Sequence, residues 1–89
     1  MEIEVRKPTP EEIETIGIRS WPVWEKGISR FPWTYDTNEE CLLLSGKVTV
    51  EMLDGRRVEF GAGDFVRFPE GLKCIWHVHE PVRKHYRFG

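Results

Sequence analysis

The sequence predicts an all-β domain, a sandwich or small barrel, with one short helix near the N-terminus. Its 89 residues fit a single domain spanning residues 1–89. After the first twenty residues no segment has a helical period, and glycine or proline interrupts the chain at short intervals. With 39% hydrophobic and 12% aromatic residues, the composition is typical of a folded globule.

The helix is predicted to begin after Thr9 and to end at Gly17. Thr9 is a suitable N-cap, and Pro10 occupies the first helical position, where its missing N–H costs no hydrogen bond. Glu12 stands three residues after the cap and completes a capping box. Two isoleucines give this short helix one apolar side.

Short strands are expected after the helix, separated by glycine and proline. They cover residues 18–24, 28–35, 41–44, 47–53, 57–60, 64–68, 73–79 and 82–88. Many short strands at this spacing are typical of a sandwich or a barrel.

A hairpin is predicted around Asp54 and Gly55. A two-residue loop made of these residues alone would place Val58 opposite Glu51, which pairs an apolar side chain with a charged one on the same face. A three-residue loop over residues 53–55 matches apolar residues and opposite charges, pairing Val50 with Val58, Val48 with Phe60 and Glu51 with Arg57. Gly55 would then take the left-handed conformation that this type of loop requires.

The charge balance argues against nucleic acid as a partner. Thirteen basic and 15 acidic residues give a net charge of −2, so no basic surplus exists to neutralise phosphates. The longest apolar run, residues 41–44, is far too short to span a bilayer. The first residues, MEIEVRKP, lack the apolar segment of a secretory signal. We therefore expect a cytoplasmic protein without membrane or nucleic-acid partners.

Two stretches carry a regular spacing of glycines and aromatic or acidic residues. The first contains Gly27, Trp33, Tyr35, Glu39 and Gly46, and the second contains Gly63, Pro69, Gly71, Cys74 and Val78. These stretches resemble the two sequence motifs of the cupin superfamily, which have histidines where Trp33, Tyr35 and Cys74 stand. The resemblance implies a small jelly-roll β-barrel, also called RmlC-like.

A subgroup of cupins is indicated by FPWTYD, the strand ending at Gly46 and the late VRKHY. These features are similar to short single-domain cupins related to ureidoglycine aminohydrolase and to the ethanolamine-utilisation cupin. The ureidoglycine enzymes use manganese to release ammonia from a ureido compound. The resemblance therefore implies, as one possibility, an enzyme that acts on a small nitrogen compound with a weakly held divalent metal.

The metal positions of common cupins correspond here to Trp33, Tyr35, Glu39 and Cys74. Indole nitrogen is only a donor, so Trp33 cannot ligate a metal. A phenol or thiol must first lose a proton, at usual pKa values of about 10 and about 8.5. If manganese, zinc or iron is bound, Glu39, Cys74 and Tyr35 are the candidate ligands, but the set is poor. We expect no tightly bound metal and no other cofactor.

Strand parity decides which side chains of the last strands point inward. Cys74, Trp76 and Val78 share the face that the motif places inside the barrel, so His77 and His79 are predicted to point outward. The two cysteines, at positions 41 and 74, are expected to be buried free thiols.

Lys84 is the anomaly of the final strand, because it shares a face with Val82, Tyr86 and Phe88. Lysine is rarely buried unless it is paired. We hypothesise that Lys84 pairs with Glu39 and supplies the positive charge that a metal supplies in metal-bearing cupins. The alternative is that Lys84 lies near the barrel mouth and extends to water.

The predicted ligand pocket consists of Trp33, Tyr35, Glu39, Cys41, Cys74, Trp76, Lys84 and Tyr86. Two functions follow from it. The first is metal-free binding of a small polar metabolite in the barrel cavity. The second is catalysis of the ureidoglycine aminohydrolase type, with Glu39 as general acid or base, Tyr35 as a proton donor and Lys84 as an anion stabiliser. The lost histidines favour the first, whereas the retained Glu39 and the inward Lys84 keep the second open.

A homodimer is expected because a domain of this size has a thin stability margin. Leu42 and Leu44 lie opposite the inward face of their strand, and we expect this second apolar face to meet a partner.

Overall fold

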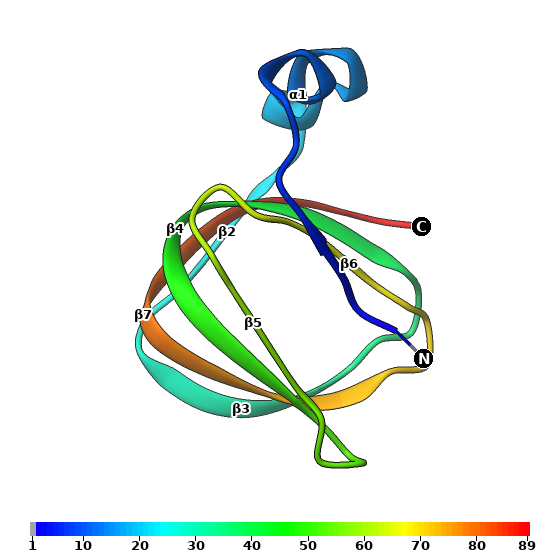
Figure 1. The fold of residues 1–89 in the computed structure, drawn as a ribbon, viewed down its shortest axis with the longest axis vertical. Helices are drawn as coiled ribbons and strands as arrows, with labels where there is room; N and C mark the ends of the chain where they lie inside the picture. Colours follow the sequence, from blue (N-terminus) through cyan, green and yellow to red (C-terminus); the bar gives the residue numbers. More distant parts are fainter. Residues whose placement is uncertain (1) are drawn as a thin grey trace.

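The computed structural model describes residues 2–89 and shows seven strands arranged as a barrel, with one helix outside it (Figure 1). In chain order the elements are β1 (Glu4–Arg6), α1 (Pro10–Ile16), the 3-10 turn η1 (Ile18–Ser20), β2 (Val23–Lys26), β3 (Ser29–Thr34), β4 (Glu39–Met52), β5 (Arg57–Gly61), β6 (Phe65–Phe68) and β7 (Lys73–Phe88). The predicted all-β class with one short helix is confirmed. Among the described residues, neither α1 nor η1 is long enough to cross a bilayer.

Two long antiparallel strands, β4 and β7, run through both layers of the barrel. The N-terminal part of β4 pairs with β6, and the C-terminal part of β7 pairs with β2, which gives the layer order β1-β6-β4-β7-β2. The opposite ends of the same two strands pair with β5 and β3 and form the second layer. The two layers therefore share their central strands, and the space between them becomes the interior.

The sequence prediction of separate strands over residues 41–44 and 47–53 is wrong, because both belong to β4. Gly46 does not end the strand. It adopts φ +105° within an irregularity that shifts the β4–β7 register between Leu43 and Val48. Leu43 and Val48 are both buried, so the bulge switches the parity of the inward face.

Residues 73–79 and 82–88 likewise form one strand, β7, rather than two. Pro81 does not interrupt it. The register places Glu80 opposite Lys47 and Arg83 opposite Ser45, so Pro81 lies where the β4 bulge already disrupts regular pairing. A proline is tolerated at such a bulge because no ladder hydrogen bond is lost there.

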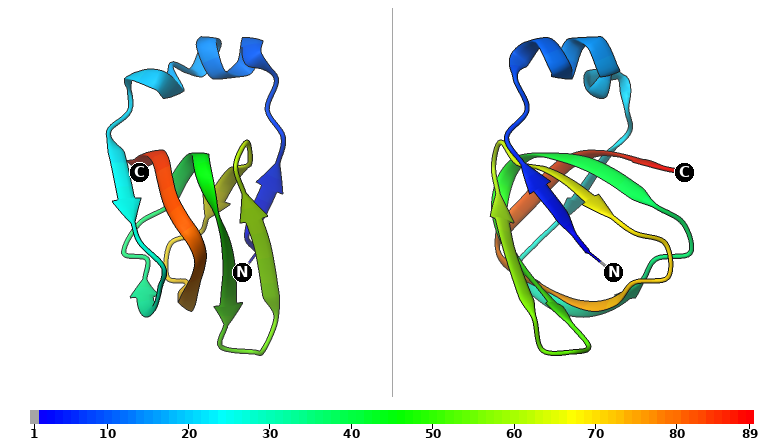
Figure 2. Two further views of the ribbon diagram at one scale, coloured as in Figure 1. Left: turned by 90° about the vertical axis from the view of Figure 1, so that its left-hand side faces the viewer. Right: turned by 45° about the vertical axis from the view of Figure 1, so that its right-hand side comes forward.

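The helix is capped as predicted. The Thr9 hydroxyl accepts a hydrogen bond from the Glu12 backbone N–H at 3.2 Å, and the Glu12 carboxylate accepts one from the Thr9 N–H. Gly17 ends the helix in the left-handed conformation, with φ +76°. Figure 2 shows α1 outside the barrel, connected to it on one side by β1 and on the other by β2.

The strand predicted over residues 18–24 is wrong in its first half, which forms η1 and an extended turn before β2. Ile18 and Trp21 are buried in a small second core with Leu42 and Phe65, and this tertiary packing overrides their strand propensity. Leu42 is therefore covered by the chain's own N-terminal segment, which corrects our expectation that its face meets a partner. Leu44 remains 43% exposed.

The hairpin between β4 and β5 has the predicted register, with the Val50–Val58, Val48–Phe60 and Glu51–Arg57 pairs all present. The Gly55 N–H donates to the Met52 carbonyl at 3.0 Å, and Gly55 has φ +89°. Local turn chemistry thus determines this part of the barrel.

Candidate functional site

A cavity of about 190 Å³ lies between the two layers of the barrel. Its walls are mostly aromatic, formed by Trp24, Phe31, Trp33, Tyr35, Trp76, Tyr86 and Phe88. Two charged side chains, Glu39 and Lys84, complete the lining. Strands β2, β3, β4 and β7 supply these residues, with Tyr35 placed just after β3.

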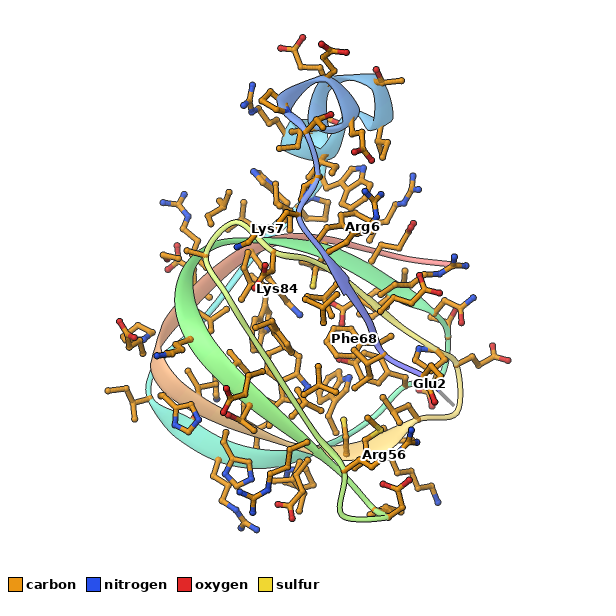
Figure 3. The ribbon with its side chains drawn as sticks, in the orientation of Figure 1. Glu2, Arg6, Lys7, Arg56, Phe68 and Lys84 are labelled. Atoms are coloured by element: carbon orange, nitrogen blue, oxygen red, sulfur yellow. The ribbon has the colours of Figure 1, made fainter. Side chains whose placement is uncertain are left out.

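The two charged side chains form a buried ion pair. Lys84 Nζ donates to Glu39 Oε2 at 2.8 Å, and the two side chains are only 5% and 3% exposed. Figure 3 shows Lys84 inside the ring of strands, whereas Arg56 lies by the β4–β5 hairpin. The hypothesis that Lys84 points inward and pairs with Glu39 is confirmed, and the alternative that it extends to water is wrong.

Strand geometry explains how the pair forms. Lys84 lies directly opposite Leu43, and Glu39 lies opposite Phe88. The Cys41–Tyr86 pair stands between them on the same inward face. The long lysine side chain reaches along this face to the carboxylate, so β4 and β7 together position the pair.

Two indole rings hold the lysine ammonium in place. Lys84 Nζ lies 4.8 Å from the ring centroid of Trp24 and 4.7 Å from that of Trp76. Trp24 is the direct cross-strand neighbour of Lys84 on β2. Desolvated contacts of this kind contribute up to about 2 kcal/mol. The cation is therefore fixed by a carboxylate and by aromatic faces.

Tyr35 is buried beside the ion pair. Its ring stacks on Phe68 with centroids 4.8 Å apart and an interplanar angle of 9°. Burial, followed by the nearby Glu39 charge, raises the pKa of the Tyr35 phenol well above its usual value. The phenol can therefore donate a hydrogen bond to the carboxylate, and it would have to lose a strongly held proton to ligate a metal.

The two cysteines do not line the cavity, in contrast to our prediction. Cys41 is fully buried in the core, where burial raises the pKa of its thiol to about 12. Burial and then the Glu39 charge raise the pKa of the Cys74 thiol to about 11, and its Sγ lies 3.7 Å from the Trp33 carbonyl oxygen. Both thiols are free and face close-packed neighbours rather than the cavity.

The residues at the four motif positions do not fit a divalent metal ion. Trp33 has no available lone pair, and burial raises the pKa values of Tyr35 and Cys74, so each would have to lose a strongly held proton to ligate a metal. Glu39 is already bonded to Lys84. No group of three or more histidine, cysteine or acidic side chains gathers elsewhere within residues 2–89.

The histidines of β7 point outward, as predicted. His77 Nε2 lies 3.2 Å from a Glu51 carboxylate oxygen, and His79 Nε2 lies 2.9 Å from the Thr49 hydroxyl. These contacts connect β7 with β4 on the outer surface, away from the cavity.

Three cavity residues were missed by the sequence analysis. Phe31 has the same parity as Trp33 and Tyr35, so the alternation that revealed those two residues could have revealed it. Phe88 shares the face of Lys84 and could have been found in the same way. Trp24 gave no such signal, because its place in the cavity depends on the distant pairing of β2 with β7.

The chain is similar to a known protein family and to several solved structures. Residues 13–86 match the sequence model of the protein family described as the EutQ-like cupin domain. A DUF861 family protein from Thermotoga maritima has 50% identity over 99% of this chain and 100% of its own, with a TM-score of 0.97. The Clostridium difficile EutQ protein has 26% identity over 74% of this chain, with a TM-score of 0.68, and the match spans 52% of that protein.

A putative ethanolamine-utilisation protein from Salmonella typhimurium has 21% identity over 99% of this chain and 69% of its own, with a TM-score of 0.68. At this identity the likeness concerns the fold alone. No curated protein matches the chain.

Proposed function

The chain belongs to the EutQ-like cupin family, and from this premise we propose that it binds a small molecule in its barrel cavity. The ligand would meet the Glu39–Lys84 pair, without a metal site of the three-histidine type. The buried ion pair on the cavity wall is the observation that carries this proposal.

A buried ion pair is a poor way to stabilise a protein core. Desolvation of the two charges offsets much of their attraction, and packed apolar residues in their place are often equally stable. A pair that lines a cavity with aromatic walls has the features of a small-molecule site, where a few polar groups orient the ligand. Lys84 has three N–H donors and gives one to Glu39, so it can also donate to a ligand.

The enzyme alternative, of the ureidoglycine aminohydrolase type, is less well supported. Glu39 could act as general acid or base, Tyr35 as a proton donor and Lys84 as an anion stabiliser. That reaction type depends on a divalent metal in the enzymes that the sequence resembles. The residues at the corresponding positions here do not fit such an ion.

A matched pair of double variants tests the binding function. Glu39→Gln with Lys84→Met removes both charges from the cavity. Glu40→Gln with Arg87→Met removes the neighbouring surface pair, whose N···O distance is also 2.8 Å. We would titrate a panel of small amides, acids, amines and alcohols by calorimetry. Binding should weaken at least tenfold in the first variant and stay unchanged in the second, and equal binding by both would contradict the role of the pair.

Metal content provides a separate test. Protein purified without a histidine tag should contain substoichiometric manganese, zinc and iron by elemental analysis. A stoichiometric content of any of these metals, retained after dialysis, would overturn the metal-free site and favour the enzyme alternative.

We also propose that the protein is a homodimer. A domain of 89 residues buries only roughly 60–65% of the surface that its unfolded chain exposes, and Leu44 is 43% exposed on the outer face of β4. Sedimentation velocity at micromolar concentration should show a dimer that weakens in Leu44→Glu. A monomer under these conditions would contradict the proposal.

A further inference from the structure

The cavity has features that select among ligand classes, and this inference rests on the binding function proposed above. We propose that the preferred occupant is an uncharged, single-ring aromatic compound with one carbonyl group, such as an aromatic amide. Its ring would lie against the aromatic walls, and its carbonyl oxygen would accept a hydrogen bond from Lys84.

The volume of the cavity is enough to enclose about one ring. A dry cavity of about 150 Å³ holds benzene, and a water molecule occupies about 30 Å³ in the liquid. The cavity here measures about 190 Å³. The difference of about 40 Å³ leaves room inside the walls for one small substituent beside a single ring.

The walls favour a planar ring over a flexible chain. Phe31 and Trp76 are nearly parallel, with centroids 6.0 Å apart and an interplanar angle of 17°. Trp24 meets both rings at steep angles, 62° and 73°. A ligand ring can stack on one of these surfaces and meet another edge-on, which are the preferred geometries of aromatic pairs.

The charges of the site favour a neutral head group. Glu39 and Lys84 neutralise each other at 2.8 Å. Among residues 2–89, no other acidic or basic side chain lines the cavity. A ligand carboxylate or ammonium would therefore lose its hydration without gaining an unpaired countercharge, whereas a carbonyl group loses much less.

The site keeps unused hydrogen-bond donors, and the Glu39 carboxylate keeps acceptor capacity beyond its bond to Lys84. Lys84 donates to Glu39 through one of its three N–H groups. The indole N–H of Trp76, in the ring that the Lys84 ammonium overlies, is buried and has no acceptor among residues 2–89. A carbonyl oxygen is an acceptor without a charge, so it matches these donors, and the N–H groups of an amide match the remaining acceptor capacity of Glu39.

Four probes of similar size test separately the preference for a neutral head group and the preference for a planar ring. Benzamide, benzoate and benzylamine share the ring and differ in charge, and cyclohexanecarboxamide keeps the amide but loses planarity. Each would be titrated calorimetrically into the wild-type protein. Benzamide should bind at least tenfold more tightly than either charged probe and at least fivefold more tightly than the cyclohexane compound.

Two further measurements locate the bound amide. The affinity for benzamide should fall at least tenfold in the Glu39→Gln/Lys84→Met variant and remain unchanged in Glu40→Gln/Arg87→Met. In wild-type protein, benzamide should shift the indole N–H signal of Trp76 in ¹H–¹⁵N spectra. This second readout needs no variant, so it stands even if the double variant does not fold, and an unmoved signal would overturn the inferred pose.

The outcomes also distinguish this inference from the proposed function. Tighter binding of benzoate or benzylamine in the cavity would overturn the neutral ligand class but leave the binding function intact. Equal affinity for cyclohexanecarboxamide would overturn the requirement for a planar ring. Failure of all four probes, together with pair-dependent binding of another compound, would overturn the inference alone. Failure of these probes and of the wider metabolite panel would overturn both.

Discussion

Replacement of Lys84 by methionine should strongly destabilise the barrel. Methionine keeps the length and apolar stem of lysine but removes the ammonium. Glu39, whose side chain is 3% exposed, would then be a buried carboxylate without its counterion. The variant also loses the contacts of the ammonium with the rings of Trp24 and Trp76.

The expected magnitude follows from the burial of the pair. Removal of one partner of a buried ion pair costs about 3–5 kcal/mol. A domain of 89 residues has a total free energy of unfolding of roughly 4–13 kcal/mol, at about 0.05–0.15 kcal/mol per residue. A loss of 1 kcal/mol lowers the melting temperature by about 4–8 °C in a domain of this size, so Lys84→Met should lower it by roughly 12–40 °C.

Urea denaturation, followed by both circular dichroism and tryptophan fluorescence, measures this loss. Arg87→Met is the matched control, because Arg87 lies on the same strand and pairs with Glu40 at 2.8 Å, but its side chain is 49% exposed. An exposed pair contributes at most about 1 kcal/mol. The Glu39→Gln/Lys84→Met variant should recover most of the stability lost in Lys84→Met.

Two results would refute this reasoning. If Lys84→Met lowers the free energy of unfolding by no more than Arg87→Met does, then removing one partner of the buried pair is no more destabilising than removing one partner of the exposed pair. A double variant as unstable as Lys84→Met would show that the unpaired carboxylate of Glu39 is not the cause of the loss.

Three further predictions concern other parts of the chain. Gly46→Ala should destabilise the fold by more than 2 kcal/mol in urea, because φ is +105° and an added Cβ would meet the Pro81 carbonyl oxygen at 2.6 Å; Gly27→Ala, in open space, should cost less than about 1 kcal/mol. Because burial raises the pKa of Cys41 from near 9 to about 12, the unfolded chain loses this proton first. Stability should therefore fall by up to about 1.4 kcal/mol per pH unit between pH 9 and 12, and pH-dependent urea titrations should show a shallower fall in Cys41→Ala. Thr9→Ala should cost about 1 kcal/mol by thermal denaturation and Thr9→Ser much less, because serine keeps the cap; equal costs would contradict the capping role.

The sequence predicted the features that depend on a few neighbouring residues. The Thr9 cap and the hairpin register were both correct, because each is determined by side chains within about ten residues of one another. The Glu39–Lys84 pair is more distant in sequence. It could still be predicted, because a lysine on an inward strand face requires a nearby carboxylate.

The features that were missed depend on contacts between distant segments. Gly46 was interpreted as a strand end, because a bulge and a turn have the same local composition, and only pairing with β7 shows which is present. Leu42 was assigned to a partner surface, since nothing local shows that Ile18 and Trp21 cover it. Cys74 fits the motif spacing, but the small thiol packs against the backbone of β3 instead of reaching the cavity.

The shared strands β4 and β7 also have a consequence for folding kinetics. Their pairing joins Glu39 to Phe88 and Met52 to Cys74, so one partner is 49 residues and the other 22 residues away along the chain. Contacts this distant slow folding, because the entropy of loop closure is lost before the contacts form. During synthesis β4 cannot pair with β7 until residues 73–88 have left the ribosome, and until then the apolar inner face of β4 lacks this partner. Neither layer can form alone, so we expect slow, all-or-none folding and uniform hydrogen-exchange protection along both strands.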